Sequence, residues 1–269
     1  MRSLRPILLL SMCLSAGAWA QNSAAAQPVV RACGHPAASP MSWDQDGRLS
    51  GVCVDAARRA FSAVGLALQV EAPVPWARCL RMVETGEVDV NLCGFVNEKR
   101  LEHAVMVEPA IGNNEAVLIV RRDSTLVYKS RADLDGLRIG MGRGVSFGAE
   151  FDTYLAQHAQ LDVALSETHN LQKLLLDRLD AVITARLAGQ QLIRNMGCES
   201  QLRVLAGKVV EGPLFMQMSK RSKHLGVLPQ LTAFMKQPAQ IDWLQGQQAR
   251  VEATYARLYP PAQTKLCER

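Results

Sequence analysis

The sequence of 269 residues lacks several features that would assign it to a well-marked functional class. Beyond the first twenty residues, no apolar run is long enough to cross a membrane. No two cysteines have CxxC spacing, and none has a histidine at zinc-finger distance, so we expect no zinc site. Basic residues exceed acidic ones by only 30 to 25, and this mild, evenly spread excess argues against nucleic acid as a partner.

The first twenty residues have the three-part layout of a secretory signal peptide. Arg2 and Arg5 precede an apolar run over residues 6–18, and Ala18-Trp19-Ala20 is a small-residue cleavage site. Without this segment the chain has 28 basic and 25 acidic residues, a net charge of +3. We therefore expect residues 1–20 to be removed and the mature protein to be exported to the periplasm.

Six cysteines remain once Cys13 is removed with the signal peptide. An even number in an exported chain favours disulfide bonds, but six thiols allow fifteen pairings among which sequence alone does not choose. They are Cys33, Cys53, Cys79, Cys93, Cys198 and Cys267.

Apolar periodicity divides the start of the mature chain into alternating strands and helices. We expect strands at 29–33, 66–71 and 88–93, and helices at 54–64 and from Pro75 to Gly86. This β-α-β-α-β order with short loops predicts a parallel sheet covered by helices.

The middle of the chain repeats this plan. Strands are expected at 137–141, 163–165 and 181–184, and helices at 146–157 and 171–178. The segments LRMVETGEVDVNL and LQKLLLDRLDAVIT each read as an apolar helix, a tight exit, and then Asp89 or Asp180 at the mouth of a buried strand. The repetition predicts two lobes built in the same way.

Two extended runs, residues 114–130 and 212–223, connect these units, and the rest of the chain reads as helices at 225–235 and 241–258. We therefore expect a first lobe over 27–118, a second lobe over 119–213, and a return to the first lobe over 214–269. Two strands joining similar α/β lobes form a hinge that can close on a ligand.

The order of the motifs from Val29 to about Lys223 resembles the periplasmic solute-binding proteins of family 3, the amino-acid type with the type II two-lobe fold. The motifs are ACGHPAASPMSW, DGRLSGVCVDAARRAF, PVPWARCLRMVETGEVDV, NEKR, ADLDGLRIGMGRGVSFG and LDAVITAR. The resemblance implies an α/β fold of two parallel-sheet lobes joined by two hinge strands, with a ligand in the cleft at the carboxyl ends of the strands.

The resemblance also implies a binding site for a carboxylate. Arg100 matches the family's arginine, whose two-pronged guanidinium suits a carboxylate. Cys93 and Gly94 match the strand end that gives the ligand backbone contacts. The loop Gly144, Val145 and Ser146 matches the segment whose backbone amides, at a helix start, help to bind the anion.

Further residues match the walls of the family's pocket. Trp76 falls on an apolar or aromatic wall, and His35 and Ala38 lie in the first loop, which forms another. Arg78, in PWAR, is a candidate second cation of the cleft.

One departure limits the ligand assignment. The family's acidic partner for an α-amino group would lie five residues after Asp180, where this chain has Ala185 followed by Arg186. A buried ammonium without a carboxylate is costly, so a carboxylate or another small anion fits as well as an amino acid.

Each site residue also has an ordinary structural interpretation. Arg100 can instead pair with Glu98 or Glu102 at the surface, and Trp76 can be a core aromatic. Cys93 can be disulfide-bonded instead of facing the ligand, Arg78 can lie on a solvated helix face, and His35 can be a simple loop histidine.

Other functional classes are also open. GVSFG at 144–148 matches the G-x-S-x-G nucleophile elbow, with Asp180 and His224 following in triad order, but no oxyanion glycine cluster precedes it. A dehydratase on the same fold needs a general acid in the cleft, and Glu98 and Glu115 are the acidic residues that the sequence places near it. A ligand sensor is the third class.

We therefore expect a monomeric, exported receptor, without catalysis, metal or cofactor, that delivers a small carboxylate-bearing solute to the permease of an ABC transporter.

Overall fold

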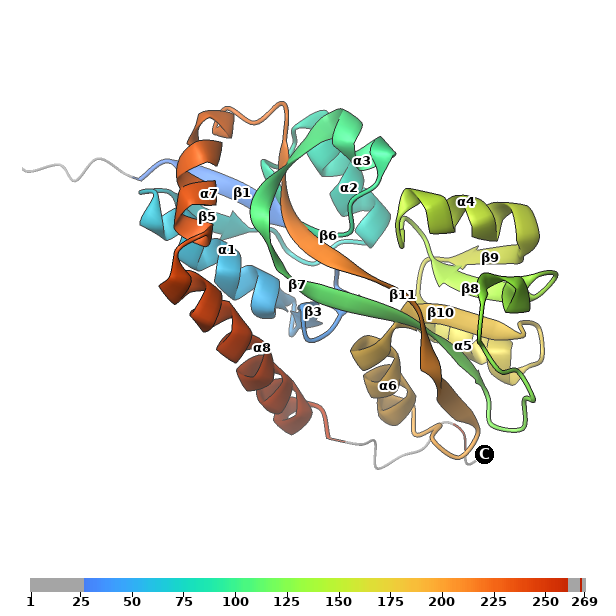
Figure 1. Ribbon diagram of the computed structural model, residues 1–269. Helices are drawn as coiled ribbons and strands as arrows, with labels where there is room; N and C mark the ends of the chain where they lie inside the picture. Colours follow the sequence, from blue (N-terminus) through green and yellow to red (C-terminus); the bar gives the residue numbers. More distant parts are fainter. Residues whose placement is uncertain (1–26, 261–266, 268–269) are drawn as a thin grey trace, which may run out of the picture.

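Figure 1 shows a computed structural model of the protein, which describes residues 27–260 and 267. A mixed sheet of eight strands runs through the molecule in the order β5-β1-β6-β11-β7-β10-β8-β9, and a small second sheet has the order β2-β3-β4. Within the described residues, no helix is both long and apolar enough to cross a membrane. The predicted signal peptide, residues 1–20, lies outside this part of the chain.

The first lobe is built on three parallel strands, as predicted. They are β1 (Val29–Cys33), β5 (Ala67–Val70) and β6 (Val90–Gly94), with β1 between the other two. Its helices are α1 (Val52–Ala63), α2 (Trp76–Thr85), α3 (Glu98–His103), α7 (Leu228–Met235) and α8 (Pro238–Leu258). The small sheet has the strands β2 (Ala37–Ala38), β3 (Ser42–Gln45) and β4 (Arg48–Ser50).

The second lobe repeats the α/β plan, with β8 between two parallel neighbours. Its strands are β8 (Arg138–Gly142), β9 (Gln160–Ala164) and β10 (Ala181–Ala185). Its helices are α4 (Ala149–His158), α5 (Glu167–Leu175) and α6 (Arg186–Asn195), the last of which was not predicted. A short 3-10 helix covers Arg131–Leu134 here, and another covers Leu225–Val227 ahead of α7 in the first lobe.

Two long antiparallel strands, β7 (Ala104–Arg121) and β11 (Leu202–Ser219), join the lobes and cross the molecule side by side in Figure 1. β11 pairs with β6 in the first lobe, and β7 pairs with β10 in the second, so the two lobe sheets are continuous. Residues 112–115 and 211–214 pair with each other between these regions. The boundaries expected at 118/119 and 213/214 lie within a few residues of this crossing and stay predictions.

The two similar sequence segments around Asp89 and Asp180 make the same contact in both lobes. The Asp89 carboxylate accepts a hydrogen bond from the backbone N–H of Arg31 at 2.8 Å, and the Asp180 carboxylate accepts one from the N–H of Arg138 at 2.7 Å. Each aspartate follows a helix, directly precedes a strand, and links the start of that strand to the neighbouring strand. The repeated helix, exit and aspartate therefore mark one structural unit that occurs twice.

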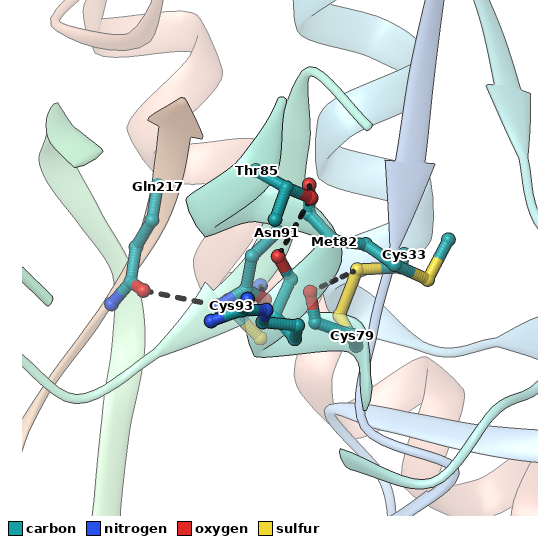
Figure 2. Close-up of a disulfide and its surroundings, with 8 residues drawn as sticks. Cys33, Cys79, Met82, Thr85, Asn91, Cys93 and Gln217 are labelled. Carbon is teal, nitrogen blue, oxygen red and sulfur yellow. Dashed lines mark hydrogen bonds between the residues drawn. A yellow bond between two sulfur atoms is a disulfide. The ribbon is translucent and has the colours of Figure 1, made fainter. Parts of the chain in front are cut away.

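Three disulfide bonds resolve the pairing that the sequence left open: Cys33–Cys79, Cys53–Cys93 and Cys198–Cys267. The first two tie the carboxyl ends of β1 and β6 to α2 and α1, and Figure 2 shows the first of them with Cys93 nearby. Bonds that close loops of this length stabilise a domain by about 4 kcal/mol each in the chain-entropy account. Two covalent links thus fix the strand ends that face the second lobe.

We predict that Asp180→Asn destabilises the protein by about 1–2 kcal/mol at neutral pH, because the Asp180 carboxylate also accepts from the Arg138 guanidinium at 2.6 Å. The Arg138 side chain lowers the pKa of Asp180. The stability that the Asp180 carboxylate contributes is present above its unfolded pKa and is lost as the pH falls through its folded pKa. Urea unfolding at pH 7 and pH 3 measures both effects, and the gap between wild type and variant should narrow at pH 3.

The exposed Asp123 provides the control, since Asp123→Asn should leave the unfolding midpoint nearly unchanged. An equal loss in both variants, or a gap that does not depend on pH, would contradict the role of Asp180.

Candidate functional site

A cavity of about 70 Å³ lies between the closed lobes, where β6, the loop after β8 and the end of β10 meet. It is lined from the first lobe by His35, Ala38, Ser42, Trp76, Cys93, Gly94, Phe95 and Arg100, and from the second by Val145, Ser146, Phe147, Glu167, Thr184 and Ala185. Two cavities of about 410 Å³ each share residues with it. The residues predicted for the site therefore largely come together at one cleft.

Arg100 is positioned by the helix on which it lies. The side chain of Asn97 caps α3 by accepting from the backbone N–H of Arg100 at 2.9 Å. The Arg100 guanidinium donates to the carbonyl oxygen of Phe95 at 2.6 Å and, across the cleft, to that of Gly144 at 3.1 Å. Arg100 thus reaches from the first lobe to the second.

In the part of the chain that the structure describes, no carboxylate forms an ion pair with Arg100. Its hydrogen-bond acceptors are neutral carbonyl groups, and within the described residues it forms no ion pair with Glu98 or Glu102, the latter lying 3.5 Å from His103 instead. Burial lowers the pKa of Arg100 to about 10, while Asp152 opposes the shift. The guanidinium stays charged at neutral pH, and it is the kind of group that a carboxylate stabilises.

Two buried amides hold the end of β6 in place. Asn91 donates to Gln217 at 3.0 Å, as Figure 2 shows, and its oxygen accepts from the N–H of Cys93. Gln217 in turn donates to the carbonyl groups of Gly94 and Phe95. A Cβ on Gly94 would lie only 3.1–3.3 Å from Arg100, Gln217 and Asn91, so a glycine here lets these polar groups converge.

Trp76 joins the lobes at the first residue of α2. Its indole N–H donates to the carbonyl oxygen of Gly144 at 3.0 Å, and the Arg100 guanidinium carbon lies 5.5 Å from its ring centre. The His35 ring packs on Trp76 with centroids 5.1 Å apart, and its Nδ1 accepts from the N–H of Ala37. Burial and then the Arg100 charge lower the pKa of His35 to about 4, so its ring is neutral at pH 7.

The loop Gly144, Val145 and Ser146 faces this cluster from the second lobe. Gly144 has φ +79°, and a Cβ there would lie 3.2–3.4 Å from α2 residues, so glycine permits the close approach. α4 begins at Ala149, three residues later than expected, because Asp152 accepts from the N–H of Phe147 and from the Ser146 hydroxyl ahead of the helix. The loop presents the Gly144 carbonyl oxygen to Arg100, and the expected contact of its backbone amides with an anion stays a prediction.

Ser146 completes the contacts between the lobes. Its hydroxyl accepts from the Asn97 side chain at 2.8 Å and donates to Asp152 at 2.5 Å. Phe95 and Phe147 also meet across the cleft, with ring centroids 6.2 Å apart. The closed arrangement is therefore held by direct contacts between residues of the site itself.

Other candidate residues lie elsewhere or have other partners. Arg78 is exposed and lines neither the cleft cavity nor its two neighbours. Cys93 lines the cavity and is also bonded to Cys53, so its two interpretations coexist. Arg186, the residue after Ala185, pairs with Glu115 at 2.5 Å.

The hydrolase triad does not form. The Ser146 hydroxyl bonds to Asn97 and Asp152, whereas the Asp180 carboxylate bonds to Arg138. The His224 ring bonds to the carbonyl oxygen of Val29 in the first lobe.

Glu167 is a cleft residue that the sequence analysis missed. It is the first residue of α5, is partly buried, and accepts a hydrogen bond from the Thr184 hydroxyl at 2.5 Å. Burial raises its pKa to about 7, against the effect of the Thr184 bond. Among the described residues no basic side chain pairs with it, and no cluster of His, Cys, Asp and Glu suits a metal ion. The cleft thus holds an unpaired cation and an unpaired carboxyl group.

Comparison with known proteins identifies relatives by sequence and fold. Residues 30–254 match the family model described as bacterial extracellular solute-binding proteins, family 3. No curated protein sequence gives a significant match.

Many solved structures share the fold at low sequence identity. An ancestral arginine-binding protein bound to arginine is 17% identical, with a TM-score of 0.68, covering 82% of this chain and 97% of its own. The substrate-binding protein AbpA of an amino acid ABC transporter from Streptococcus pneumoniae, bound to L-arginine, is 17% identical, with a TM-score of 0.64 and coverage of 83% and 95%. A histidine kinase sensor domain similar to periplasmic binding proteins is 19% identical, with a TM-score of 0.70 and coverage of 82% and 95%.

We predict that Glu167→Gln makes the protein more stable at pH 8 and leaves its stability at pH 4 unchanged. A carboxyl group whose folded pKa is raised loses stability as pH rises from its unfolded pKa, near 4.5, to its folded pKa, near 7. Glutamine keeps the Thr184 contact without a charge, so the gain at pH 8 should be on the order of 1 kcal/mol after solvent screening. Urea unfolding curves at the two pH values measure it.

Glu199, exposed on the same lobe, provides the matched control, since Glu199→Gln should be neutral at both pH values. A destabilised Glu167→Gln protein at pH 8 would show that the carboxylate has a cationic partner in the folded state.

Proposed function

The chain belongs to the bacterial extracellular solute-binding proteins of family 3, and we propose that it captures a small carboxylate-bearing solute by closing its lobes and delivers it to the permease of an ABC transporter. The observation that carries this proposal is Arg100, a partly buried guanidinium in the cleft whose acceptors among the described residues are two carbonyl groups. Such a group gains most from an anion with two oxygens.

The ligand carboxylate would take the place of the Gly144 carbonyl oxygen at Arg100. That oxygen accepts from both Arg100 and Trp76, and a carboxylate supplies two acceptors and a negative charge in its stead. The inner cavity of about 70 Å³ is small, so the lobes must separate somewhat to admit a solute. The larger cavities on either side give it room along the cleft.

Closure would be driven by contacts that only the closed state makes. The first lobe contributes Arg100 and Trp76, and the second contributes the loop 144–146. A solute that touches both binds the closed state more tightly than the open one and shifts the population toward it. We propose that the closed form, as a monomer in the periplasm, is the form that a permease recognises.

A sensing role is the second candidate. The similarity to a histidine kinase sensor domain favours it. Adding the solute-loaded protein to membrane vesicles that contain the permease separates the two roles. An increase in solute uptake supports transport, and uptake equal to that without the protein favours sensing.

We predict that amino acids, dicarboxylates or related small anions raise the melting temperature of the wild-type protein, and that Arg100→Ala removes this effect. A ligand at 100 times its Kd stabilises by about 2.7 kcal/mol. Arg100→Lys keeps the charge but loses the planar fork, and should weaken binding by about tenfold. Thermal shift and calorimetry measure the affinities.

Arg178, exposed on the second lobe, offers the matched control, and Arg178→Ala should bind as the wild type does. Carboxylate binding that persists in Arg100→Ala would refute the proposed anchor.

A further inference from the structure

Phe95, the residue directly after β6, makes contacts in three directions. Its carbonyl oxygen accepts hydrogen bonds from the Arg100 guanidinium at 2.6 Å and from the buried side chain of Gln217 at 2.9 Å. Its ring meets the ring of Phe147 in the second lobe, and it also lies against β11 at Gly212. One residue of the first lobe thus contacts the proposed anchor, the hinge and the opposite lobe.

Gly212 lies in the part of β11 that crosses between the lobes, paired with Asn114 of β7 (Figure 1). Pro213 follows it and restricts residue 212 to extended conformations. The backbone of Gly212 has no positive φ angle, so its conformation would accept an alanine. The conformation of the strand therefore does not require a glycine at this position.

The ring of Phe95 does require one. A Cβ at residue 212 would lie 2.9 Å from the ring carbon Cε1 of Phe95 and 3.2 Å from its Cδ1. Carbon atoms pack at about 3.5–4.0 Å, so a methyl group at 212 would displace the ring. Because it has no side chain, Gly212 lets the backbone of the hinge strand approach the ring closely.

The ring has little room to move in the closed protein. Phe95 is 9% exposed, and the inner cavity that it lines has a volume of about 70 Å³. Its partner Phe147 lies with its ring centroid 6.2 Å away and packs in turn on Phe151, which is buried in the second lobe. A displaced ring would therefore press on Phe147 or enter the inner cavity. Separation of the lobes moves Phe147 away and relieves this restriction.

We propose that Phe95 is a positioning residue for closure: its ring lies against Gly212 of the hinge and Phe147 of the second lobe, and these contacts set how far the lobes close. This inference rests on the proposed function, since closure is what retains the solute. A displaced ring would disfavour the closed state more than the open one, and the complex would open sooner. The contact at Gly212 thus governs how long the solute stays bound.

The test is a double-mutant cycle with Gly212→Ala, Phe95→Leu and the variant that carries both substitutions. Gly112→Ala is the matched control. Gly112 lies in the other hinge strand, paired with Leu214, and a Cβ there would lie 3.5 Å from the nearest atom, the terminal methyl carbon of Met41. This distance is an ordinary contact, so the control adds a methyl group to the hinge without displacing a ring.

The probes are L-arginine, L-glutamine, L-glutamate and succinate. Calorimetry measures their affinities and the number of binding sites, and stopped-flow tryptophan fluorescence measures their dissociation rates. For a probe that binds the wild type, Gly212→Ala should lower the affinity about tenfold, mainly through faster dissociation. In the Phe95→Leu background the same substitution should cost less than about twofold, because the smaller side chain leaves room for the methyl group. Gly112→Ala should bind within about twofold of the wild type, and every variant should keep one binding site.

The outcomes separate this inference from the proposed function. Binding that Gly212→Ala leaves unchanged, or a loss of the same size in the Phe95→Leu background, overturns the role of Phe95 and leaves the proposed function intact. An equal loss in Gly112→Ala would show that any added methyl group in the hinge acts alike, which also overturns it. Weaker binding that appears as fewer sites with an unchanged dissociation rate would contradict a role in closure. If none of the four probes binds the wild type, the proposed function and this inference fail together.

Discussion

The cleft depends on one physical constraint: the partly buried guanidinium of Arg100 is held by carbonyl groups, and no carboxylate between residues 27 and 260 pairs with it. Asn97 fixes the start of its helix, and the carbonyl groups of Phe95 and Gly144 accept its hydrogen bonds. The buried amide of Gln217 holds the Phe95 carbonyl, and its side chain is only 1% exposed. The carbonyl groups of Phe95 and Gly144 lie in different lobes, so the proposed anchor for a ligand also joins the lobes in the closed protein.

Much of the fold follows from local sequence signals. Apolar segments of strand length, each separated by a helix with an apolar face, predict parallel α/β lobes, and the repetition around Asp89 and Asp180 predicts two of them. The repetition is informative because each aspartate makes the same bond to the neighbouring strand. The family resemblance added the cleft residues Arg100 and Trp76, since their roles depend on partners far away in the chain.

Glu167 shows why the rest of the site could not be predicted. It lies at the start of a helix, where an acidic residue is favoured for local reasons and attracts no notice. It belongs to the cleft because it bonds to Thr184, which lies on β10, and because it is buried between the lobes. Likewise, α6 (RLAGQQLIRN) is rich in polar residues and contains a glycine, so its apolar face does not stand out in the sequence. Strands β2 and β4 of the small sheet are too short to leave a pattern. Contacts between distant segments decide these features.

The indole of Trp76 makes the opening and closing of the cleft detectable by tryptophan fluorescence. Of the three tryptophans in the described part of the chain, it is the one whose N–H bonds to the opposite lobe, and a guanidinium lies near its ring. Separation of the lobes would expose that N–H to water and move the charge, both of which alter indole emission. The fluorescence of the unlabelled protein therefore reports the state of its cleft.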